Sequence, residues 1–121
     1  MYARGMAEIS PREMQLARII LFTADIDAMS EFYGQVIGLK QITNEKGWKE
    51  FAAGSARIAL HSGPPSPGRK GPKIVFYAHD VASVRATLIA RGARFGKLRE
   101  GDFCLCDGKD PDGNPIQLSN R

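Results

Sequence analysis

The chain repeats one pattern of residues, and this repeat limits the fold more than any other feature of the sequence. Residues 18–25 (RIILFTAD) align with residues 73–80 (KIVFYAHD), and both are short β-rich runs that end in an aspartate suited to cap a helix. A helical spacing of apolar residues follows each run and ends at a glycine, Gly38 or Gly92. Such spacing places apolar side chains on one helix face, and the glycine permits a left-handed cap. Each half therefore begins with a strand and a helix.

Three further short strands are expected after each of these helices. In the first half they cover residues 40–43, 48–52 and 57–61, and in the second half residues 94–98, 102–107 and 115–119. Turn-forming residues such as glycine, asparagine, aspartate and proline separate most of these segments. Both halves therefore predict the element order βαβββ.

A segment rich in glycine and proline separates the two halves. Residues 62–72 contain three glycines and four prolines, a composition that continues neither a helix nor a strand. We therefore expect one domain over residues 15–120, with module one at about 15–61, a linker at 62–72 and module two at about 73–120. Residues 1–14 form a lead-in, either a short helix that starts at the capping box of Ser10 or a disordered segment.

Composition limits the function classes. At 121 residues, with 43% hydrophobic and 25% charged residues, the chain is typical of a single soluble globular domain. Its apolar runs are too short to cross a bilayer and residues 1–10 lack a signal-like apolar stretch, so we expect a cytoplasmic protein without membrane contact. The net charge of +4 is spread along the chain, which argues against nucleic-acid binding and favours anionic over cationic ligands.

The only two cysteines, Cys104 and Cys106, lie two positions apart on an expected strand. Their side chains then point to the same side of the strand and cannot readily reach disulfide geometry with each other. We therefore interpret them as small buried hydrophobic residues, and they give no indication of an oxidising compartment.

Two local motifs give the repeat a family resemblance. Residues 20–25, followed by Phe32-Tyr33 and by residues 37–39, resemble the opening strand, helix and turn of the vicinal oxygen chelate superfamily of glyoxalases, bleomycin-resistance proteins and dioxygenases. Residues 110–118 (DPDGNPIQL) resemble its closing hairpin. The resemblance covers about residues 16–119. It implies an α+β fold in which two βαβββ modules form a curled eight-stranded mixed sheet around a cup, with the helices on the convex face. It also implies a homodimer.

Strand alternation indicates which side chains face this cup. On the first strand of each half the purely apolar set should pack on the helix, so Arg18 and Lys73 fall on the cup side. The same rule directs Gln117 inward on the last strand, and Glu50 also faces inward if its strand turns its polar side to the cup. The ligand-binding residues predicted in this way are Arg18, Phe22, Trp48, Lys73, Tyr77 and Gln117.

The resemblance also raises the question of a metal. Metal-binding members of the superfamily use four inward positions, typically His, Glu, His and Glu. By resemblance, these positions hold Arg18, Ala59, Lys73 and Gln117 in this chain. Only Gln117 offers an oxygen lone pair, and two cations would repel a divalent ion, so we predict no metal and no other cofactor. A site rebuilt around His61, with Glu50 or the cysteines, is the alternative.

Two cations at the former metal positions have two interpretations. Arg18 forms an internal salt bridge with Glu50, or Arg18 and Lys73 clamp an anionic ligand between aromatic walls. The favoured function is binding of a small anionic metabolite without the usual metal site. Catalysis stays open. An enzyme of this kind would carry out lyase or isomerase chemistry on a small oxygenated metabolite, with His61 or Glu50 as the acid–base candidate.

Three other function classes remain as alternatives. One is a metal-dependent lyase or isomerase of the glyoxalase I kind with displaced ligands. Another is a drug-sequestering resistance protein, although the positive charge of the chain suits cationic drugs poorly. The last is an interaction protein whose cup has lost its ligand.

Overall fold

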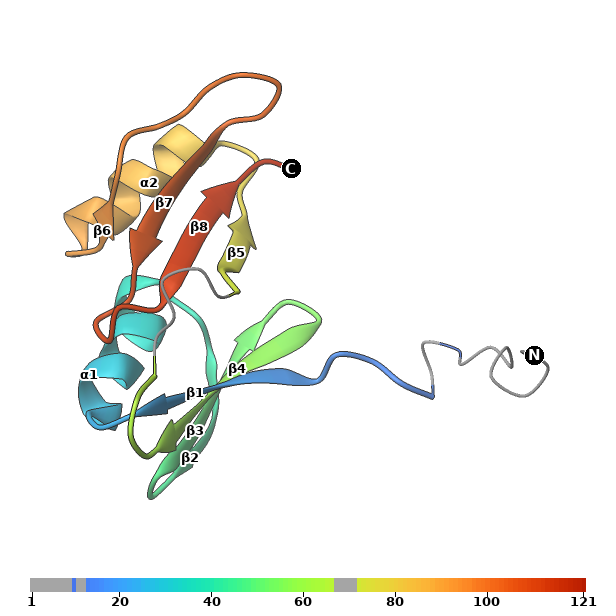
Figure 1. Cartoon of the computed structure of the whole chain (residues 1–121), viewed down its shortest axis with the longest axis vertical. Coiled ribbons are helices and arrows are strands. Elements are labelled where there is room, and N and C mark those ends of the chain that lie inside the picture. The colour runs from blue at the N-terminus through green and yellow to red at the C-terminus, as the bar shows by residue number, and fades with distance from the viewer. Residues whose placement is uncertain (1–9, 11–12, 67–71) are drawn as a thin grey trace.

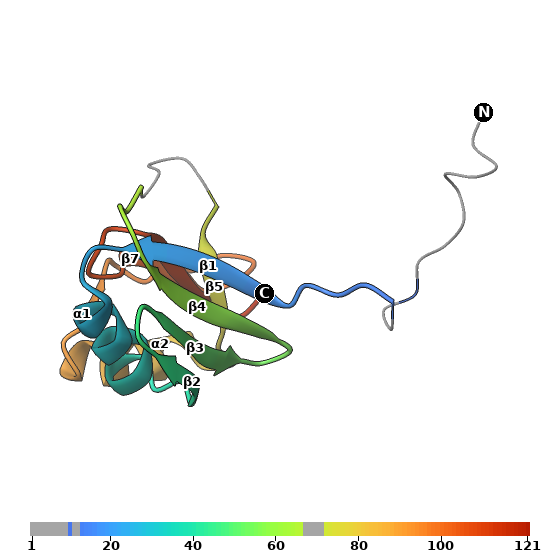
Figure 2. The same cartoon turned by 90° about the horizontal axis from the view of Figure 1, so that it is seen from below.

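In the computed structural model, which describes residues 10, 13–66 and 72–121, the first half of the chain forms a four-stranded sheet with a helix on one face. Its elements are β1 (Arg18–Thr23), α1 (Ile26–Glu31), the π-helical turn η1 (Phe32–Val36), β2 (Gln41–Glu45), β3 (Trp48–Ala53) and β4 (Ala56–Ser62). The strand order is β1-β4-β3-β2, which Figure 2 shows from below, with β1 and β4 parallel and the other pairs antiparallel.

The second half repeats this arrangement. Its elements are β5 (Ile74–Tyr77), α2 (Val81–Ala90), β6 (Arg94–Phe95), β7 (Leu105–Lys109) and β8 (Pro115–Ser119), in the sheet order β5-β8-β7-β6. The predicted α+β class and the βαβββ order of each half are confirmed. The eight strands divide into two four-stranded sheets, one above the other in Figure 1, and no strand pair joins them in the described part of the chain.

Each helix begins and ends as the sequence predicts. The side chains of Asp25 and Asp80 accept hydrogen bonds from the backbone N–H groups of Ala28 and Ser83, at 3.0 and 3.1 Å. Gly38 and Gly92 follow the helices with φ angles of +88° and +101°, in the left-handed region that glycine tolerates.

The first helix differs from its prediction in one respect, because it widens into a π-helical turn at Phe32. There the N–H of Ile37 donates to the carbonyl oxygen of Phe32, five residues earlier, at 2.8 Å. Within this turn Gly34 lies against the ring of Phe51, and a Cβ atom at position 34 would come within 3.0 Å of that ring. Glycine therefore permits the close packing of the turn on the sheet.

The core lies between each sheet and its helix. In the first half it includes Met29, Tyr33, Phe51, Ile58 and Leu60, and in the second half Val81, Leu88, Cys106, Ile116 and Leu118. Alternate residues of β4 and β8 thus point to the helices, as the strand pattern predicts. No helix in the described residues is long and apolar enough to cross a membrane.

Some boundaries in the second half differ from those expected. Strand β6 ends at Phe95 instead of residue 98, and β7 begins at Leu105 instead of residue 102. A single bridge between Arg99 and Leu105 closes the segment between them into a loop, with reciprocal backbone hydrogen bonds of 2.8 and 3.0 Å. The predicted lead-in and linker fall partly on residues 1–9, 11–12 and 67–71, outside the described residues.

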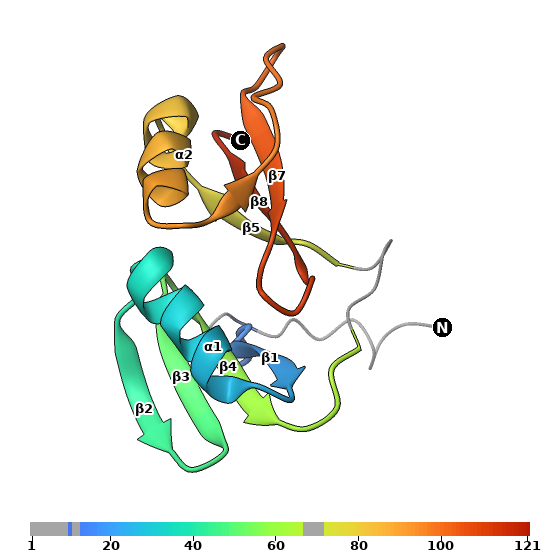
Figure 3. The ribbon, with the colours of Figure 1, turned by 90° about the vertical axis from the view of Figure 1, so that its left-hand side faces the viewer.

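The two modules meet where η1 approaches the turn between β7 and β8, as Figures 1 and 3 show. The hydroxyl of Tyr33 donates to Asp110 Oδ2 at 2.7 Å, and both residues are buried. A second bond joins Arg91 Nη1, just after α2, to the carbonyl oxygen of Val36 at 3.2 Å. These polar contacts link the first module to the second.

Candidate functional site

Each sheet has an open face, which we define as the face that points away from its helix. The open face of the first sheet carries Arg18, Ile20, Phe22, Trp48, Glu50, Arg57, Ala59 and His61, and that of the second carries Lys73, Val75, Tyr77, Asp107 and Gln117. Large apolar side chains are uncovered here, with Phe22 49% and Tyr77 65% exposed. The sequence-predicted ligand-binding residues therefore lie on the two open faces, with Arg18, Phe22 and Trp48 on the first sheet and Lys73, Tyr77 and Gln117 on the second.

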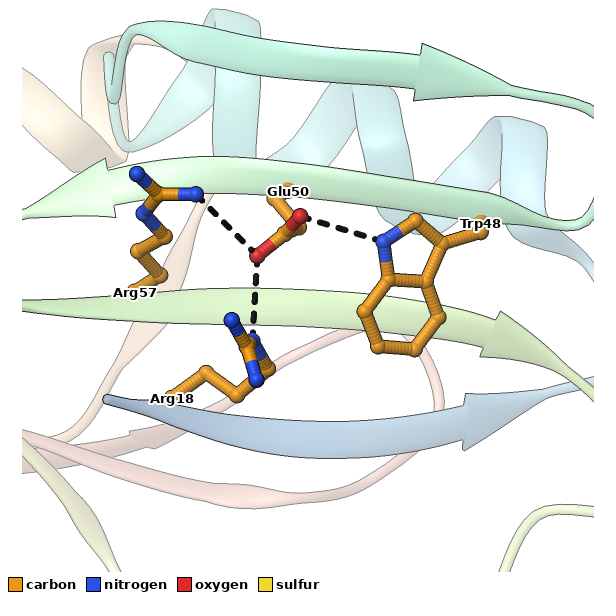
Figure 4. A network of polar contacts seen from close by, with 4 residues as sticks. All are labelled: Arg18, Trp48, Glu50 and Arg57. Atoms are coloured by element: carbon orange, nitrogen blue, oxygen red, sulfur yellow. Dashed lines mark hydrogen bonds and ion pairs between the residues drawn. The ribbon is translucent and has the colours of Figure 1, made fainter. Parts of the chain in front are cut away.

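A buried carboxylate organises the first open face (Figure 4). Glu50 is only 6% exposed and accepts hydrogen bonds from Arg18 Nε at 3.1 Å and from Trp48 Nε1 at 3.1 Å. Arg57 Nη1 lies 3.5 Å from the same oxygen that Arg18 contacts. We call these four residues the Glu50 group. The hydrogen bond from Trp48 and the contacts with Arg18 outweigh desolvation and hold the pKa of Glu50 below its usual value.

Three aromatic rings extend this face beside the Glu50 group. The His61 ring centroid lies 5.3 Å from that of Phe22 and 5.5 Å from that of Trp48, the latter edge-on. His61 Nδ1 lies 2.9 Å from the carbonyl oxygen of Ser62, which can only accept, so Nδ1 carries the hydrogen. In neutral His61, Nε2 then keeps its lone pair. The two acid–base candidates thus share one face, with Glu50 held by cations and His61 exposed.

The second open face has an equivalent group around Asp107. Its Oδ1 accepts hydrogen bonds from Lys73 Nζ at 3.0 Å and Gln117 Nε2 at 2.8 Å, and its Oδ2 pairs with Arg99. We call these residues the Asp107 group. Partial burial acts to raise the pKa of Asp107, but the hydrogen bonds from Gln117 and Lys73 and the charge of Arg99 outweigh it, so this pKa is lowered.

The two groups occupy equivalent places in the two modules. Glu50 is the cross-strand partner of Ala59, and Asp107 is the partner of Gln117. In each group one carboxylate is shared by two cations, which leaves one net positive charge. The sequence interpretation did not include Asp107. Alignment of the last two strands of each half would have shown that Asp107 is equivalent to Glu50.

Arg18 and Lys73 belong to different groups on different sheets. Of the two interpretations left open for Arg18, the salt bridge with Glu50 is formed. Lys73 has its own partner in Asp107, and no hydrogen bond or ion pair joins the two groups within the described ranges. Within one chain, each cation is therefore held by a carboxylate of its own sheet.

The side chains at the four resemblance-derived metal positions do not fit a divalent ion. Ala59 is buried and has no ligand atom, and the amide of Gln117 is turned so that its nitrogen donates to Asp107. Within residues 13–66 and 72–121, no three histidine, cysteine, aspartate or glutamate side chains lie close enough together to hold a metal ion. Cys104 and Cys106 are free thiols, and burial raises the pKa of Cys106. The side chains at these positions therefore do not form a set of ligands for a metal ion that would act as a Lewis acid.

A cavity of about 860 Å³ lies away from the Glu50 group, at the junction of the modules. Phe32 of η1 lines it from the first module. The second module contributes Gly92, Arg94, Phe95, Gly96, Asp107, Gly108, Lys109, Asp110, Pro111 and Gly113. Asp107 is the only member of either carboxylate group that borders it. We call this space the junction cavity, and strand patterns alone did not predict it.

Two βαβββ modules, each with a helix on one face of its sheet and an open face on the other, define a class of small α+β proteins built from a repeated module. The sequence assigns this chain to one family of that class. Residues 15–118 match the model of the Glyoxalase/Bleomycin resistance protein/Dioxygenase superfamily, so the chain belongs to this superfamily, as the resemblance predicted. Among curated proteins, none matches the chain.

Three solved structures with similar folds are each less than 25% identical in sequence to this chain and therefore support the fold alone. SMU.1112c has 24% identity and a TM-score of 0.76 over 88% of this chain and 98% of its own. The lactoylglutathione lyase of Agrobacterium tumefaciens has 21% identity and a TM-score of 0.70, over 87% and 92%. TnmS3, an antibiotic-binding protein from Streptomyces sp. CB03234, has 19% identity and a TM-score of 0.74, over 87% and 93%.

Proposed function

We propose that the protein binds a small organic anion with an apolar or aromatic body on its open faces, without the metal that other family members use. The observation that carries this proposal is the arrangement of charge. In each module one carboxylate is shared by two cations, which leaves a net positive charge beside uncovered apolar side chains. An anion on these faces gains electrostatic attraction and apolar contact together.

The Glu50 group has donors left over for such a ligand. Arg18 contacts Glu50 through Nε, and Arg57 contacts it through Nη1 at the long distance of 3.5 Å. A guanidinium has five N–H donors, so most of those on both arginines make no hydrogen bond within the described part of the chain. Their side chains are 40% and 47% exposed. Glu50 thus orients two cations and leaves them accessible, which is the role of a positioning residue.

The apolar part of the ligand would lie on the aromatic surface of the first sheet. The His61 ring packs against both Phe22 and Trp48, and Ile20 on the same face is 43% exposed. On the second sheet, Val75 and Tyr77 are exposed in the same way. Uncovered apolar side chains beside a few polar anchors are typical of small-molecule sites. We therefore propose that Phe22 and Trp48 contact the body of the ligand.

A homodimer would give Lys73, Tyr77 and Gln117 a place in the same site. We propose that a second copy covers the exposed apolar residues and brings one chain's Asp107 group near the other chain's Glu50 group. We further propose that the protein is cytoplasmic and has neither a nucleic acid nor a membrane as its partner. The net charge of +4 is spread along the chain and forms no basic stripe, which argues against a nucleic-acid surface.

The same aromatic surface supports drug sequestration as a second candidate function. TnmS3, an antibiotic-binding protein, has a similar fold, and the aromatic rings of Phe22, His61 and Trp48 on one face suit a flat drug. The net positive charge of the Glu50 and Asp107 groups favours anionic drugs over cationic ones. A metal-dependent lyase with displaced ligands has less support, since no cluster of potential ligands occurs among the described residues.

The proposal is tested by small ligands that share a benzene ring and differ in the charge of the attached polar group. Benzoate is expected to raise the melting temperature of the full chain, because a ligand that binds only the folded state stabilises it. Benzylamine and benzyl alcohol are expected to have no effect. Arg18→Gln and Arg57→Gln should each remove the benzoate response, whereas Lys46→Gln, an equal change of charge in the exposed turn after β2, should keep it. An equal response to benzylamine, or a full benzoate response in both arginine variants, would refute the proposal.

A further inference from the structure

We propose a second anion-binding site in the junction cavity, in which Arg94 and Lys109 hold a phosphate monoester with a flat apolar body. The proposed open-face site does not use Arg94 or Lys109, although Asp107 borders both places, so variants of these two cations test this proposal separately.

Strand pairing places the two cations side by side. In the antiparallel pair of β6 and β7, Arg94 lies directly opposite Lys109, and both residues line the junction cavity. Directly opposed residues project on the same side of a sheet, with Cβ atoms only about 5 Å apart. Like charges in this relationship destabilise a strand pair. Their presence here is accounted for if an anion lies between them.

No protein group in the described structure neutralises this pair. Neither Arg94 nor Lys109 makes a side-chain hydrogen bond or ion pair with any described residue. Two aspartates also border the cavity, but both are engaged elsewhere. Asp107 is held by Lys73, Arg99 and Gln117. The carboxylate oxygens of Asp110 accept from Tyr33, from the Asn114 side chain and from the backbone N–H groups of Asp112 and Asn114.

The size and walls of the cavity suit an organic phosphate. Its volume of about 860 Å³ falls within the range of small-molecule pockets, about 300 to 1,000 Å³. Phe32, Phe95 and Pro111 supply apolar wall, and the glycines leave the backbone uncovered. A phosphate monoester carries about two negative charges at neutral pH. That charge matches an arginine, which can bind two oxygens at once, beside a lysine, which acts as a point charge.

The site makes an unusual prediction for the protein without ligand. Removal of one cation relieves the repulsion across β6 and β7, so Arg94→Gln and Lys109→Gln should leave the melting temperature unchanged or raise it. The same variants should lose ligand affinity. A merely structural role for these residues predicts the opposite, a lower melting temperature with affinity unchanged.

Calorimetric titration of the full chain with phenyl phosphate tests the site. Phenyl phosphate should bind more tightly than inorganic phosphate, because the ring adds apolar contact, and benzyl alcohol should not bind. Arg94→Gln and Lys109→Gln should each weaken phenyl phosphate binding by about tenfold or more, as expected for loss of a charge-assisted contact. Lys97→Gln makes the same change of charge at an exposed position outside the cavity and should bind normally.

The result also separates this site from the Glu50 group. Unchanged phenyl phosphate binding in both Arg94→Gln and Lys109→Gln overturns the proposal, and loss of that binding in Arg18→Gln would then place the ligand beside the Glu50 group. Loss in the junction variants with an intact benzoate response supports two distinct sites.

Discussion

The hydroxyl of Tyr33 donates to Asp110 Oδ2 across 77 residues of sequence, and this bond joins the first module to the turn between β7 and β8. Burial and the neighbouring Asp110 charge raise the pKa of Tyr33 above its usual value, so its hydroxyl is a neutral donor at neutral pH. The remaining donors to Asp110 come from its own turn, namely Asp112 and Asn114. Tyr33 is therefore the only described residue of the first module that donates to this carboxylate.

Replacement of this tyrosine should weaken the protein measurably. Tyr33→Phe keeps the ring in the core but removes a buried hydrogen bond to a charged group, and we expect a loss of about 1 to 3 kcal/mol in the free energy of unfolding. Urea denaturation measures this change. Tyr77→Phe is the matched control, because Tyr77 is 65% exposed and should change stability by less than about 0.5 kcal/mol. Equal stability of the two variants would show that the Tyr33 bond contributes nothing.

Glycine at position 108 is required by close packing between β6 and β7. A Cβ atom there would overlap the carbonyl oxygen of Arg94 and approach Cδ1 of the Phe95 ring to 2.8 Å. Gly108→Ala should therefore destabilise the protein by about 1 to 3 kcal/mol or more, since the backbone must shift. Gly101→Ala is the control, because nothing lies within 4 Å of its added methyl group. Thermal denaturation that ranks the two variants equally would contradict this packing.

The Glu50 group predicts a particular dependence of stability on pH. Because the folded state lowers the pKa of Glu50 below 4.5, the carboxylate stabilises the fold above that pH and this contribution is lost as the pH falls through the folded-state pKa. Glu50→Gln should therefore be less stable than the original protein at neutral pH, with the difference shrinking in acid. Denaturation curves over a pH series measure it. A difference that stays constant below the pKa would show that the charge of Glu50 is not involved.

Because the open faces lack a set of metal ligands, we expect a chelator to have no effect on the stability or ligand binding of the protein. With arginine, alanine, lysine and glutamine at the four family positions, dialysis against EDTA should leave both the melting temperature and the benzoate response unchanged. Elemental analysis before dialysis supplies the check. A stoichiometric divalent metal whose removal lowers the melting temperature would contradict this prediction, because it would mean that side chains of the protein do form a metal site.

The repeat in the sequence was sufficient to predict the order of elements and much of the inward and outward alternation. Ile58 and Leu60 pack on the core while Arg57 before them and His61 after them do not, because successive side chains of a strand point to opposite faces. The salt bridge of Arg18 with Glu50 could be named as one of two possibilities. Strand alternation alone could not decide between them, because the choice depends on side-chain geometry.

The relationships that sequence reasoning missed depend on register between strands. The repeat could have identified Asp107 as the counterpart of Glu50, but its place beside Gln117 and Lys73 follows only from the pairing of β7 with β8. The opposition of Arg94 and Lys109 likewise appears only once β6 is aligned with β7. The junction cavity depends in addition on how Phe32 of one module meets the other. Local patterns carry no information about such distances, because they arise from packing between segments far apart in the chain.

The equivalence of Glu50 and Asp107 bears on how such a chain can diverge. In each half the carboxylate of the open face is paired with cations from the same half, so neither half depends on the other for this electrostatic compensation. A single ancestral module that paired with a copy of itself would have met no uncompensated charge, and fusion of two copies would have preserved that condition. After fusion, substitutions in one half could alter its ligand preference while the other half kept the original arrangement.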